Sequence, residues 1–302
     1  MTHAPHPDPR ESADRCAPTA QLRGDPLLGT AFVQARVLMV EQPGPWGPAG
    51  LRESHFDAAI AAELEERAAL SGTRVQAVRR PGRTAPASRR RWALADSRAG
   101  SEVLRWGSYG ADAELLDLPL DGSAGTADLE RLYLVCAHSR RDPCCALRGR
   151  PVAAAIEAIR PGRVWECSHL GGHRFAANVL VLPAGLLYGR VAPLAAAEFV
   201  AAADADEVIG GLLRGRLGIA PVAQAALGFA YDQLAIRERA ALRLVSVCPP
   251  TGGLASVRLA GPHGLLDVSV RIEEHTEPRL SCAKPLPDRY LSYHPLGILA
   301  VE

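Results

Sequence analysis

The sequence has a single lysine and no long hydrophobic run. Lys284 is its only lysine, so arginine carries nearly all of the positive charge, and the formal net charge is +1. A chain this close to neutral has no overall field to draw it to nucleic acid or a membrane surface. No apolar run reaches the ~18 residues that span a bilayer, and the polar N-terminus lacks the apolar core of a signal peptide. We therefore expect a cytoplasmic protein with no nucleic-acid or membrane partner.

The chain also lacks the cysteine pattern of a small secreted domain. It has seven cysteines, an odd number, and their spacing is not that of a disulfide scaffold. In a compartment that keeps thiols reduced, clustered Cys and His favour metal binding or redox chemistry over structural bridges.

The 302 residues suffice for one large domain or two small ones, and the order of predicted elements suggests an internal repeat. Residues 37–106 and 132–191 share the order strand, loop, helix, strand, loop, strand, strand. The helix of the second copy is expected from Pro151. This order is typical of thioredoxin-like folds, in which the loop after the first strand carries the reactive group at the start of a helix. We predict an α/β protein of two tandem thioredoxin-like copies packed as an intramolecular sandwich.

The remaining segments complete the predicted domain organisation. Residues after the second copy are expected to form helices at 194–213 and 222–236, and short strands separated by Pro/Gly turns follow. Those strands are expected at 244–247, 255–259, 265–272 and 280–283. The predicted boundaries are a flexible N-terminal arm at 1–27, a first copy at 28–125, a second copy at 126–240 and a C-terminal β extension at 241–302.

Only the second copy has Cys and His in both of its loops. Cys136 and Cys145 follow the first strand of this copy, and His169 and His173 follow the second strand, with Gly171-Gly172 between the imidazoles. Glycines allow a tight loop and a close approach of the backbone. Two thiolates and two imidazoles suit zinc or a [2Fe-2S] cluster with a Rieske-like ligand set. The residues alone therefore predict a metal site and leave the metal open.

The same loops resemble a known family. Cys136-Ala-His-Ser-Arg-Arg-Asp-Pro-Cys-Cys145-Ala-Leu-Arg-Gly and His169-Leu-Gly-Gly-His173-Arg-Phe-Ala are similar to the sucrase/ferredoxin-like family, and Gly29-Thr-Ala and Glu41-Gln-Pro-Gly-Pro-Trp-Gly look like its bacterial branch. The resemblance covers most of residues 25–240. It implies a thioredoxin-like ferredoxin fold for residues 126–240, with a [2Fe-2S] cluster bound as in fungal relatives. No candidate pair of catalytic carboxylates supports the sucrase part of the name.

Carried over residue by residue, the resemblance implies His169 and His173 on one iron and Cys136 and Cys145 on the other. Cys144 is the alternative to Cys145, which is preferred because it stands at the start of the expected helix. Other residues near the loops have simpler interpretations. His138 and Asp142 are expected to close the first loop, and Cys167, Cys248 and Cys282 to be buried. Cys16 is expected to be an ordinary thiol.

Arginines surround the two loops and the first copy. Four of them are expected to ring the site or form a solvated face, and they are Arg140, Arg141, Arg148 and Arg174. A second basic run could dock an acidic redox partner or be a solvated loop, and it consists of Arg79, Arg80, Arg83, Arg89, Arg90 and Arg91. No aromatic platform accompanies this run, which argues against nucleic acid.

Two classes of function fit these features, and a third is weaker. The first is an electron-transfer protein with a Cys2His2 [2Fe-2S] cluster and a redox partner protein. The second is a thioredoxin-like thiol–disulfide oxidoreductase that uses Cys136 and Cys144 or Cys145, although the sequence lacks Cys-x-x-Cys in these loops and adjacent cysteines make a strained disulfide. The third is a structural zinc-binding module.

Overall fold

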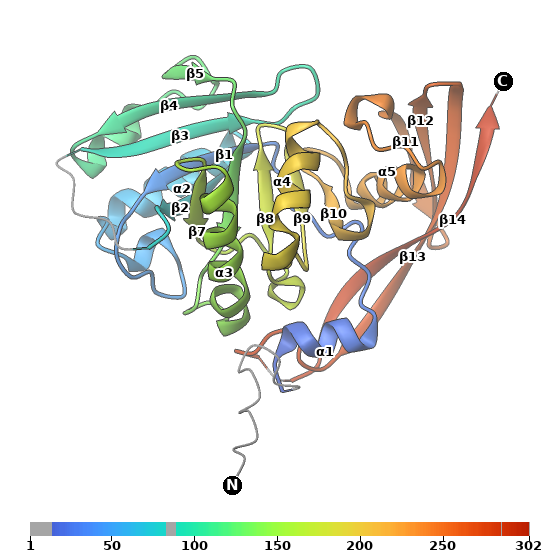
Figure 1. Cartoon of the computed structure of the whole chain (residues 1–302), viewed down its shortest axis with the longest axis horizontal. Coiled ribbons are helices and arrows are strands. Elements are labelled where there is room, and N and C mark those ends of the chain that lie inside the picture. Colours follow the sequence, from blue (N-terminus) through green and yellow to red (C-terminus); the bar gives the residue numbers. More distant parts are fainter. Residues whose placement is uncertain (1–13, 83–88, 285, 302) are drawn as a thin grey trace, which may run out of the picture.

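The computed structural model describes residues 14–82, 89–284 and 286–301. Ten strands form one mixed sheet in the order β10-β9-β8-β6-β7-β2-β1-β3-β4-β5, and four more form a separate antiparallel sheet. Helices lie on the outer faces of the large sheet (Figure 1). The predicted α/β class is therefore confirmed. Among the described residues, no helix is long and apolar enough to cross a membrane.

The first half of the large sheet is built around a β-α-β unit. Strands β1 and β2 are parallel, β3 pairs antiparallel with β1, and β4 pairs antiparallel with β3. The elements are β1 (Arg36–Glu41), α2 (Ala58–Leu70), β2 (Thr73–Arg79), β3 (Arg90–Asp96), β4 (Val103–Tyr109) and β5 (Thr126–Asp128). Helix α2 begins after Asp57, whose carboxylate accepts from the N–H groups of Ala59 and Ile60, as an N-cap does.

The second half has the same strand order and directions. Strands β6 and β7 are parallel, β8 pairs antiparallel with β6, and β9 pairs antiparallel with β8. The elements are β6 (Leu132–Cys136), α3 (Pro143–Ile159), β7 (Val164–Cys167), β8 (Val179–Leu182) and β9 (Leu186–Tyr188). The two halves join where β2 pairs with β7. The expectation that α3 begins at Pro151 is wrong: the helix starts two turns earlier and contains that proline.

The large sheet folds over so that its two halves face each other. Trp106 on β4 lies 5.7 Å from Trp165 on β7, measured between ring centroids, although three strands separate β4 from β7 in the sheet order. Val37 and Met39 of β1 share one buried cluster with Leu132 and Leu134 of β6. In Figure 1, β3 and β4 run crosswise to β8 and β9. The core between the halves is thus formed by alternate residues of both β-α-β units.

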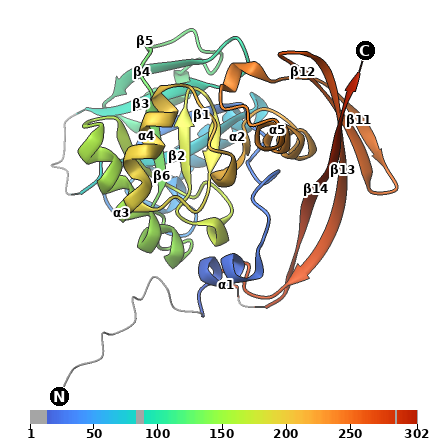
Figure 2. The same ribbon diagram turned by 45° about the vertical axis from the view of Figure 1, so that its right-hand side comes forward.

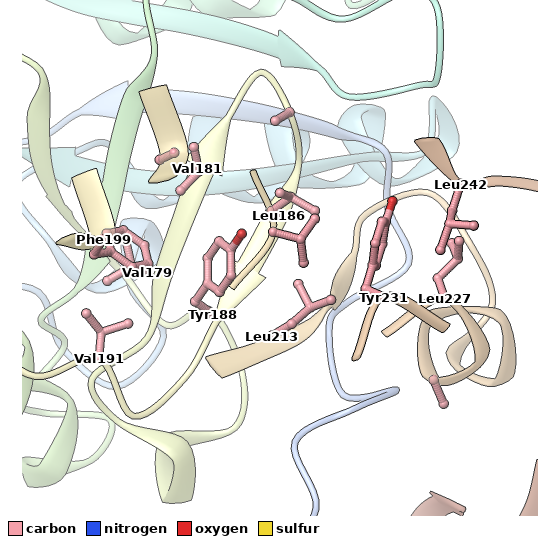
Figure 3. Close-up of a cluster of buried hydrophobic side chains, with 14 of the residues drawn as sticks. Val179, Val181, Leu186, Tyr188, Val191, Phe199, Leu213, Leu227, Tyr231 and Leu242 are labelled. Carbon is pink, nitrogen blue, oxygen red and sulfur yellow. The ribbon is translucent and has the colours of Figure 1, made fainter. Parts of the chain in front are cut away.

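The outer faces of the sheet are covered by helices. Leu38 and Val40, which alternate with the inward residues of β1, pack against α2. In the second half, Val179, Val181 and Tyr188 pack with α3 and with Phe199 of α4 (Ala196–Asp204), and the cluster continues to α5 (Pro221–Gln233) (Figure 3). The helix expected at 194–213 is wrong after residue 204, because α4 ends at Asp204 and Leu213 already begins strand β10 (Leu213–Arg216).

The C-terminal residues form the second sheet, in the order β11-β12-β13-β14. Its strands are β11 (Arg243–Thr251), β12 (Leu254–Gly261), β13 (Gly264–Glu277) and β14 (Asp288–Val301). Helix α5 packs between this sheet and the main body (Figure 2). A C-terminal β extension was expected, but its last strand was placed wrongly: residues 280–283 are a connection, and β14 follows.

The N-terminal residues that the structure describes do not form an arm without contacts. Cys16–Arg23 form helix α1, which lies at the lower end of β13 and β14 in Figures 1 and 2. Cys16, Ala17 and Ala20 are buried there. The expected flexible arm is therefore wrong for residues 14–27, and residues 1–13 lie outside the described residues. Short 3-10 helices complete the chain, and they are η1 (Leu51–Glu53), η2 (Asp112–Asp117), η3 (His173–Phe175), η4 (Pro193–Ala195), η5 (Gly210–Leu212) and η6 (Arg239–Ala241).

Candidate metal centre

The two Cys/His loops lie side by side because they leave neighbouring parallel strands. Cys136 is the last residue of β6 and pairs with Cys167, the last residue of β7. The carboxyl ends of parallel strands meet at one edge of a sheet, so the loops after them are neighbours. Asp142 then caps α3, with Oδ1 accepting from the Cys144 N–H at 2.9 Å. This cap starts the helix early enough to place Cys145 in its first turn.

Three of the four predicted ligands meet at this edge. One ligand atom from each of Cys136, Cys145 and His169 lies within 4.8 Å of the others. Cys145 Sγ is 3.9 Å from His169 Nδ1. A close approach of α3 to β6 makes this possible, because a Cβ on Gly149 would lie 2.1 Å from the Cys136 carbonyl oxygen.

The fourth residue, His173, stacks on His169. Their ring centroids are 5.0 Å apart and the ring planes are inclined by 26°. His173 Nδ1 is buried and has no hydrogen-bond partner among the described residues. A buried polar atom without a partner costs free energy, so this nitrogen is free to bind a metal on the ring that stacks on His169.

Cys144 points away from this group, although it is the neighbour of Cys145. Successive residues of an α-helix are turned by about 100°, and Cys144 Sγ lies 3.6 Å from Cys282 Sγ. Cys144 also shares a buried cluster with Cys16. The structure therefore places Cys145, and not Cys144, beside Cys136.

The candidate site has a buried side and an exposed side. Cys136 and Cys145 are 0% exposed, whereas His169 and His173 are partly exposed. A pocket of about 330 Å³ lies beside His169 and is lined by Gly50, Arg74, Gln76 and His138, among others. Any bound group would approach solvent on the side of the histidines.

The two thiols differ in their acidity. The hydrogen bond from Cys145 and the contact with His169 hold the pKa of Cys136 well below its usual value. The same thiol pair and burial raise the pKa of Cys145. Burial lowers the pKa of His173, which favours the neutral imidazole that a metal requires. These directions favour a thiolate at Cys136 and a neutral imidazole at His173.

The guanidinium of Arg214 binds the backbone of the histidine loop, which runs from His169 to His173. The sequence alone did not point to this residue. Its guanidinium donates to the Gly171 carbonyl and to Asn178 Oδ1, both at 2.9 Å. Arg214 is 1% exposed, and burial lowers its pKa to about 9. Gly172 has a φ of 62°, and a Cβ there would lie 2.5 Å from Arg214 Nη2. Arg214 lies on β10, more than forty positions after the loop, and no local pattern distinguishes it from the other arginines.

A model of the sucrase/ferredoxin-like family matches residues 27–215 of this chain, a range that includes both Cys/His loops. The chain belongs to the sucrase/ferredoxin-like family. The match begins before β1 and ends in β10, so α1, α5 and the C-terminal sheet of this sucrase/ferredoxin-like protein lie outside it.

One curated relative is a fungal protein. The Candida glabrata protein named "Altered inheritance of mitochondria protein 32" is 26% identical over 121 residues, which cover 34% of this chain and 39% of the relative. The chain thus matches less than half of that relative's length. No solved structure matches the sucrase/ferredoxin-like chain.

His138 has a structural role in this sucrase/ferredoxin-like site. Its Nδ1 accepts from the His169 N–H at 3.2 Å, and its Nε2 lies 2.8 Å from the Gly47 carbonyl oxygen. The ring is 2% exposed and makes an edge contact with Trp46. The ring joins the loop that carries His169 to the first half of the sheet, whereas the expected closure of the Cys loop is made by the backbone, since the Asp142 N–H donates to the His138 carbonyl.

Several arginines expected near the site make other contacts. Arg140 and Arg141 are exposed, whereas Arg174 pairs with Asp25 at 3.1 Å and lies over Tyr290. In the basic run, five arginines contact carboxylates or tryptophans, and they are Arg79, Arg80, Arg89, Arg90 and Arg91. Arg83 lies outside the described residues.

The remaining cysteines divide into three environments. Cys167 is 0% exposed in the core between the two halves, as expected. Cys248 is exposed on the C-terminal sheet, so the expectation that it is buried is wrong. Cys282 is only partly buried and lies against Cys16 and Cys144. Cys16, expected to be an ordinary thiol, belongs to the same group.

Proposed function

We propose that this protein is an electron carrier whose [2Fe-2S] cluster is held by Cys136, Cys145, His169 and His173. The observation that carries the proposal is the meeting of two thiols and the imidazole of His169 at one sheet edge, with the ring of His173 stacked on that imidazole. The donor set suits the cluster: two thiolates and two neutral nitrogens are the Rieske-type combination. The unpartnered Nδ1 of His173 supports its inclusion.

A [2Fe-2S] cluster accepts and releases one electron, and neutral imidazole ligands raise its reduction potential relative to four thiolates. The residues of this chain would set how that electron moves. The buried thiols anchor the deep side, while the partly exposed imidazoles face the partner. An imidazole that keeps one N–H can gain or lose its proton as the charge of the site changes, so electron transfer would be coupled to proton transfer at His169 and His173.

For the fold around the site, we propose that both halves are thioredoxin-like copies and that the second is a thioredoxin-like ferredoxin of the family's bacterial branch. The equal strand order of the halves supports the repeat. The Cys loop of the second copy supports it too, because it lies between the first strand and the start of the helix, where such folds carry their reactive group.

The burial of both thiols favours a carrier over a thiol–disulfide oxidoreductase. A disulfide exchange requires a thiolate that reaches the substrate disulfide, but Cys136 and Cys145 are 0% exposed. Zinc remains the alternative metal for the same four donors, since Cys2His2 sets also suit it. Analysis of iron and acid-labile sulfide separates these cases.

The test is spectroscopic and uses protein purified without oxygen. Absorption and EPR spectra before and after dithionite should report a reducible [2Fe-2S] cluster, with iron and sulfide at two per chain as that cluster requires. His169→Cys and His173→Cys should each retain a cluster and lower its potential by on the order of a few hundred millivolts, because an anionic ligand replaces a neutral one. The pH dependence of the potential should weaken in both variants.

Matched controls use residues of the same type outside the group. His263→Cys changes an exposed histidine of the C-terminal sheet, and Cys167→Ala removes a buried thiol on the strand beside Cys136. Both should leave the spectrum unchanged. A colourless protein without iron, or His-to-Cys variants with unaltered spectrum and potential, would overturn the proposal.

The partner and the compartment are proposals too. We propose a redox partner protein that docks on the histidine side, with exposed Arg140 and Arg141 available to an acidic surface. A cytoplasmic location is supported by the thiols, since all seven cysteines are free and reduced thiols persist in that compartment.

A further inference from the structure

A second cluster of metal-ligand side chains lies behind the candidate centre. Cys16 of α1, Asp142 and Cys144 at the start of α3, and Cys282 between β13 and β14 each place a ligand atom within 4.8 Å of the others. These residues come from three distant parts of the sequence, and two of them lie outside the part matched by the family.

The distances in this cluster match those around one tetrahedral metal ion. Zinc–sulfur bonds of about 2.3 Å at tetrahedral angles put neighbouring sulfurs about 3.8 Å apart. Cys282 Sγ lies 3.6 Å from both Cys144 Sγ and Cys16 Sγ. Cys16 Sγ lies 3.6 Å from each carboxylate oxygen of Asp142. The four side chains thus surround a point that suits a mononuclear ion.

Asp142 supplies an independent observation. It is 0% exposed, and none of the ion pairs among the described residues includes it. A buried carboxylate is normally paired with a cation or bound to a metal. Its oxygens do accept hydrogen bonds, from the N–H groups of Cys144 and Cys282 and from Ser281 Oγ. These donors and the N-terminus of α3 stabilise and orient the carboxylate, as the hydrogen-bonding partners of a metal-binding carboxylate do.

We propose that Cys16, Cys144, Cys282 and Asp142 form a structural zinc site that ties the N-terminal helix and the C-terminal sheet to the start of α3. Thiolate ligands select zinc among the common divalent ions, and four protein ligands leave no position open for a substrate. The Cys16 N–H donates to Cys282 Sγ at 3.3 Å, which stabilises a thiolate. Helix α1 has only eight residues, too few to be stable alone, so the metal holds it in place.

The first experiment measures zinc per chain in the full-length protein. The wild type should hold one zinc, and Cys16→Ser and Cys282→Ser should each lose most of it, whereas Cys248→Ser, which changes an exposed cysteine, should retain it. A variant with both His169→Ala and His173→Ala should also retain one zinc, because the proposed ligands are intact. Zinc that is lost from the histidine variant but kept in Cys16→Ser and Cys282→Ser would overturn the proposal.

Four measurements on the wild type remain informative if a variant fails to fold. Zinc-edge X-ray absorption should show three sulfurs and one oxygen, whereas two sulfurs and two nitrogens would place the zinc elsewhere. Cobalt-substituted protein should show the intense visible bands of a tetrahedral thiolate site.

Peptide mapping of protein purified without oxygen must find these thiols unlinked; a disulfide between any two of Cys16, Cys144 and Cys282 would overturn the proposal. Trypsin should cleave after Arg23 at least tenfold faster once zinc is removed, and an unchanged rate would contradict the proposed role in holding α1.

Discussion

Individual residues at the candidate centre divide into the proposed metal ligands and the residues that hold those ligands in position. Cys136, Cys145, His169 and His173 offer the sulfur and nitrogen atoms. Arg214 instead fixes the backbone of the histidine loop through Gly171 and the neighbouring Asn178. Its charge lies in the interior without a carboxylate partner among the described ion pairs, so it also acts electrostatically on the buried thiols.

Replacement of Arg214 should separate these two effects. Arg214→Met removes the donors to Gly171, Asn178 and Thr30 and leaves buried acceptors unpaired, at a cost of about 2–4 kcal/mol of unfolding free energy. It should also lower the reduction potential of the centre, because a nearby positive charge is lost. Arg214→Lys keeps a charge but not the planar fork, so the potential should change less while stability still falls. Denaturant unfolding and redox titration measure the two quantities.

Arg271→Met is the control for Arg214, since Arg271 is exposed on β13. It should change the unfolding free energy by no more than about 0.5 kcal/mol and leave the potential unaltered. An Arg214→Met protein with wild-type stability would show that the loop does not depend on this guanidinium.

At the scale of elements, the centre depends on how closely α3 packs on β6. Gly149 permits this approach, because a Cβ there would lie 2.1 Å from the Cys136 carbonyl oxygen. The helix begins at Pro143 under the cap of Asp142, and this early start puts two adjacent cysteines in its first turn. Helical rotation then sends Cys145 to the candidate centre and Cys144 to the second cluster.

Gly149→Ala should therefore disturb both stability and metal binding. The added methyl meets backbone atoms that cannot move aside, so α3 must shift away from β6, at a cost of about 3 kcal/mol. The shift separates Cys145 from Cys136, and bound iron should fall in proportion. Gly211→Ala is the matched control, because no atom lies within 4 Å of its added Cβ. Thermal unfolding and iron analysis of both variants provide the test, and normal iron content in Gly149→Ala would contradict the packing argument.

At the scale of the molecule, charged residues join the two halves of the folded sheet. Glu102, between β3 and β4, pairs with Arg216 of β10 at 2.7 Å and with Arg239 at 3.1 Å. Burial alone would raise the pKa of Glu102, but hydrogen bonds from the backbone and Arg239 and the charge of Arg216 hold it below its usual value. A carboxylate whose pKa is lower in the folded state stabilises that state at neutral pH.

This contribution should disappear in acid. Above its unfolded pKa, Glu102 should contribute about 1–2 kcal/mol, and the contribution is lost as pH falls through the lower folded pKa. Glu102→Gln should thus be less stable than wild type at about pH 7, and the difference should shrink as the pH falls through the folded pKa of Glu102. Thermal unfolding over this range, with exposed Glu66→Gln as control, is the measurement. A stability difference that is independent of pH would refute the electrostatic origin.

Much of the fold followed from local sequence patterns. The two β-α-β units, the hairpin after the first unit and α5 are near their predicted positions, because each has a clear period of buried residues or a flanking turn. The errors lie where tertiary contacts override local preference. Pro151 was read as a helix start but is tolerated inside α3, and residue 213 was read as helix but pairs with β9.

The sequence by itself put Cys136, Cys144 and Cys145 after one strand of the second unit and His169 and His173 after the next, and the family resemblance implied Cys136, Cys145, His169 and His173 as ligands with Cys144 as the alternative to Cys145. Parallel strands bring such loops together whatever the rest of the chain does. Only the tertiary structure decided that Cys144 faces Cys16 and Cys282, that Arg214 lies under the histidine loop, and that Trp106 meets Trp165. These contacts join segments far apart in the sequence. No local pattern of residues predicts them, because they form only when the sheet folds over and both ends of the chain pack onto it.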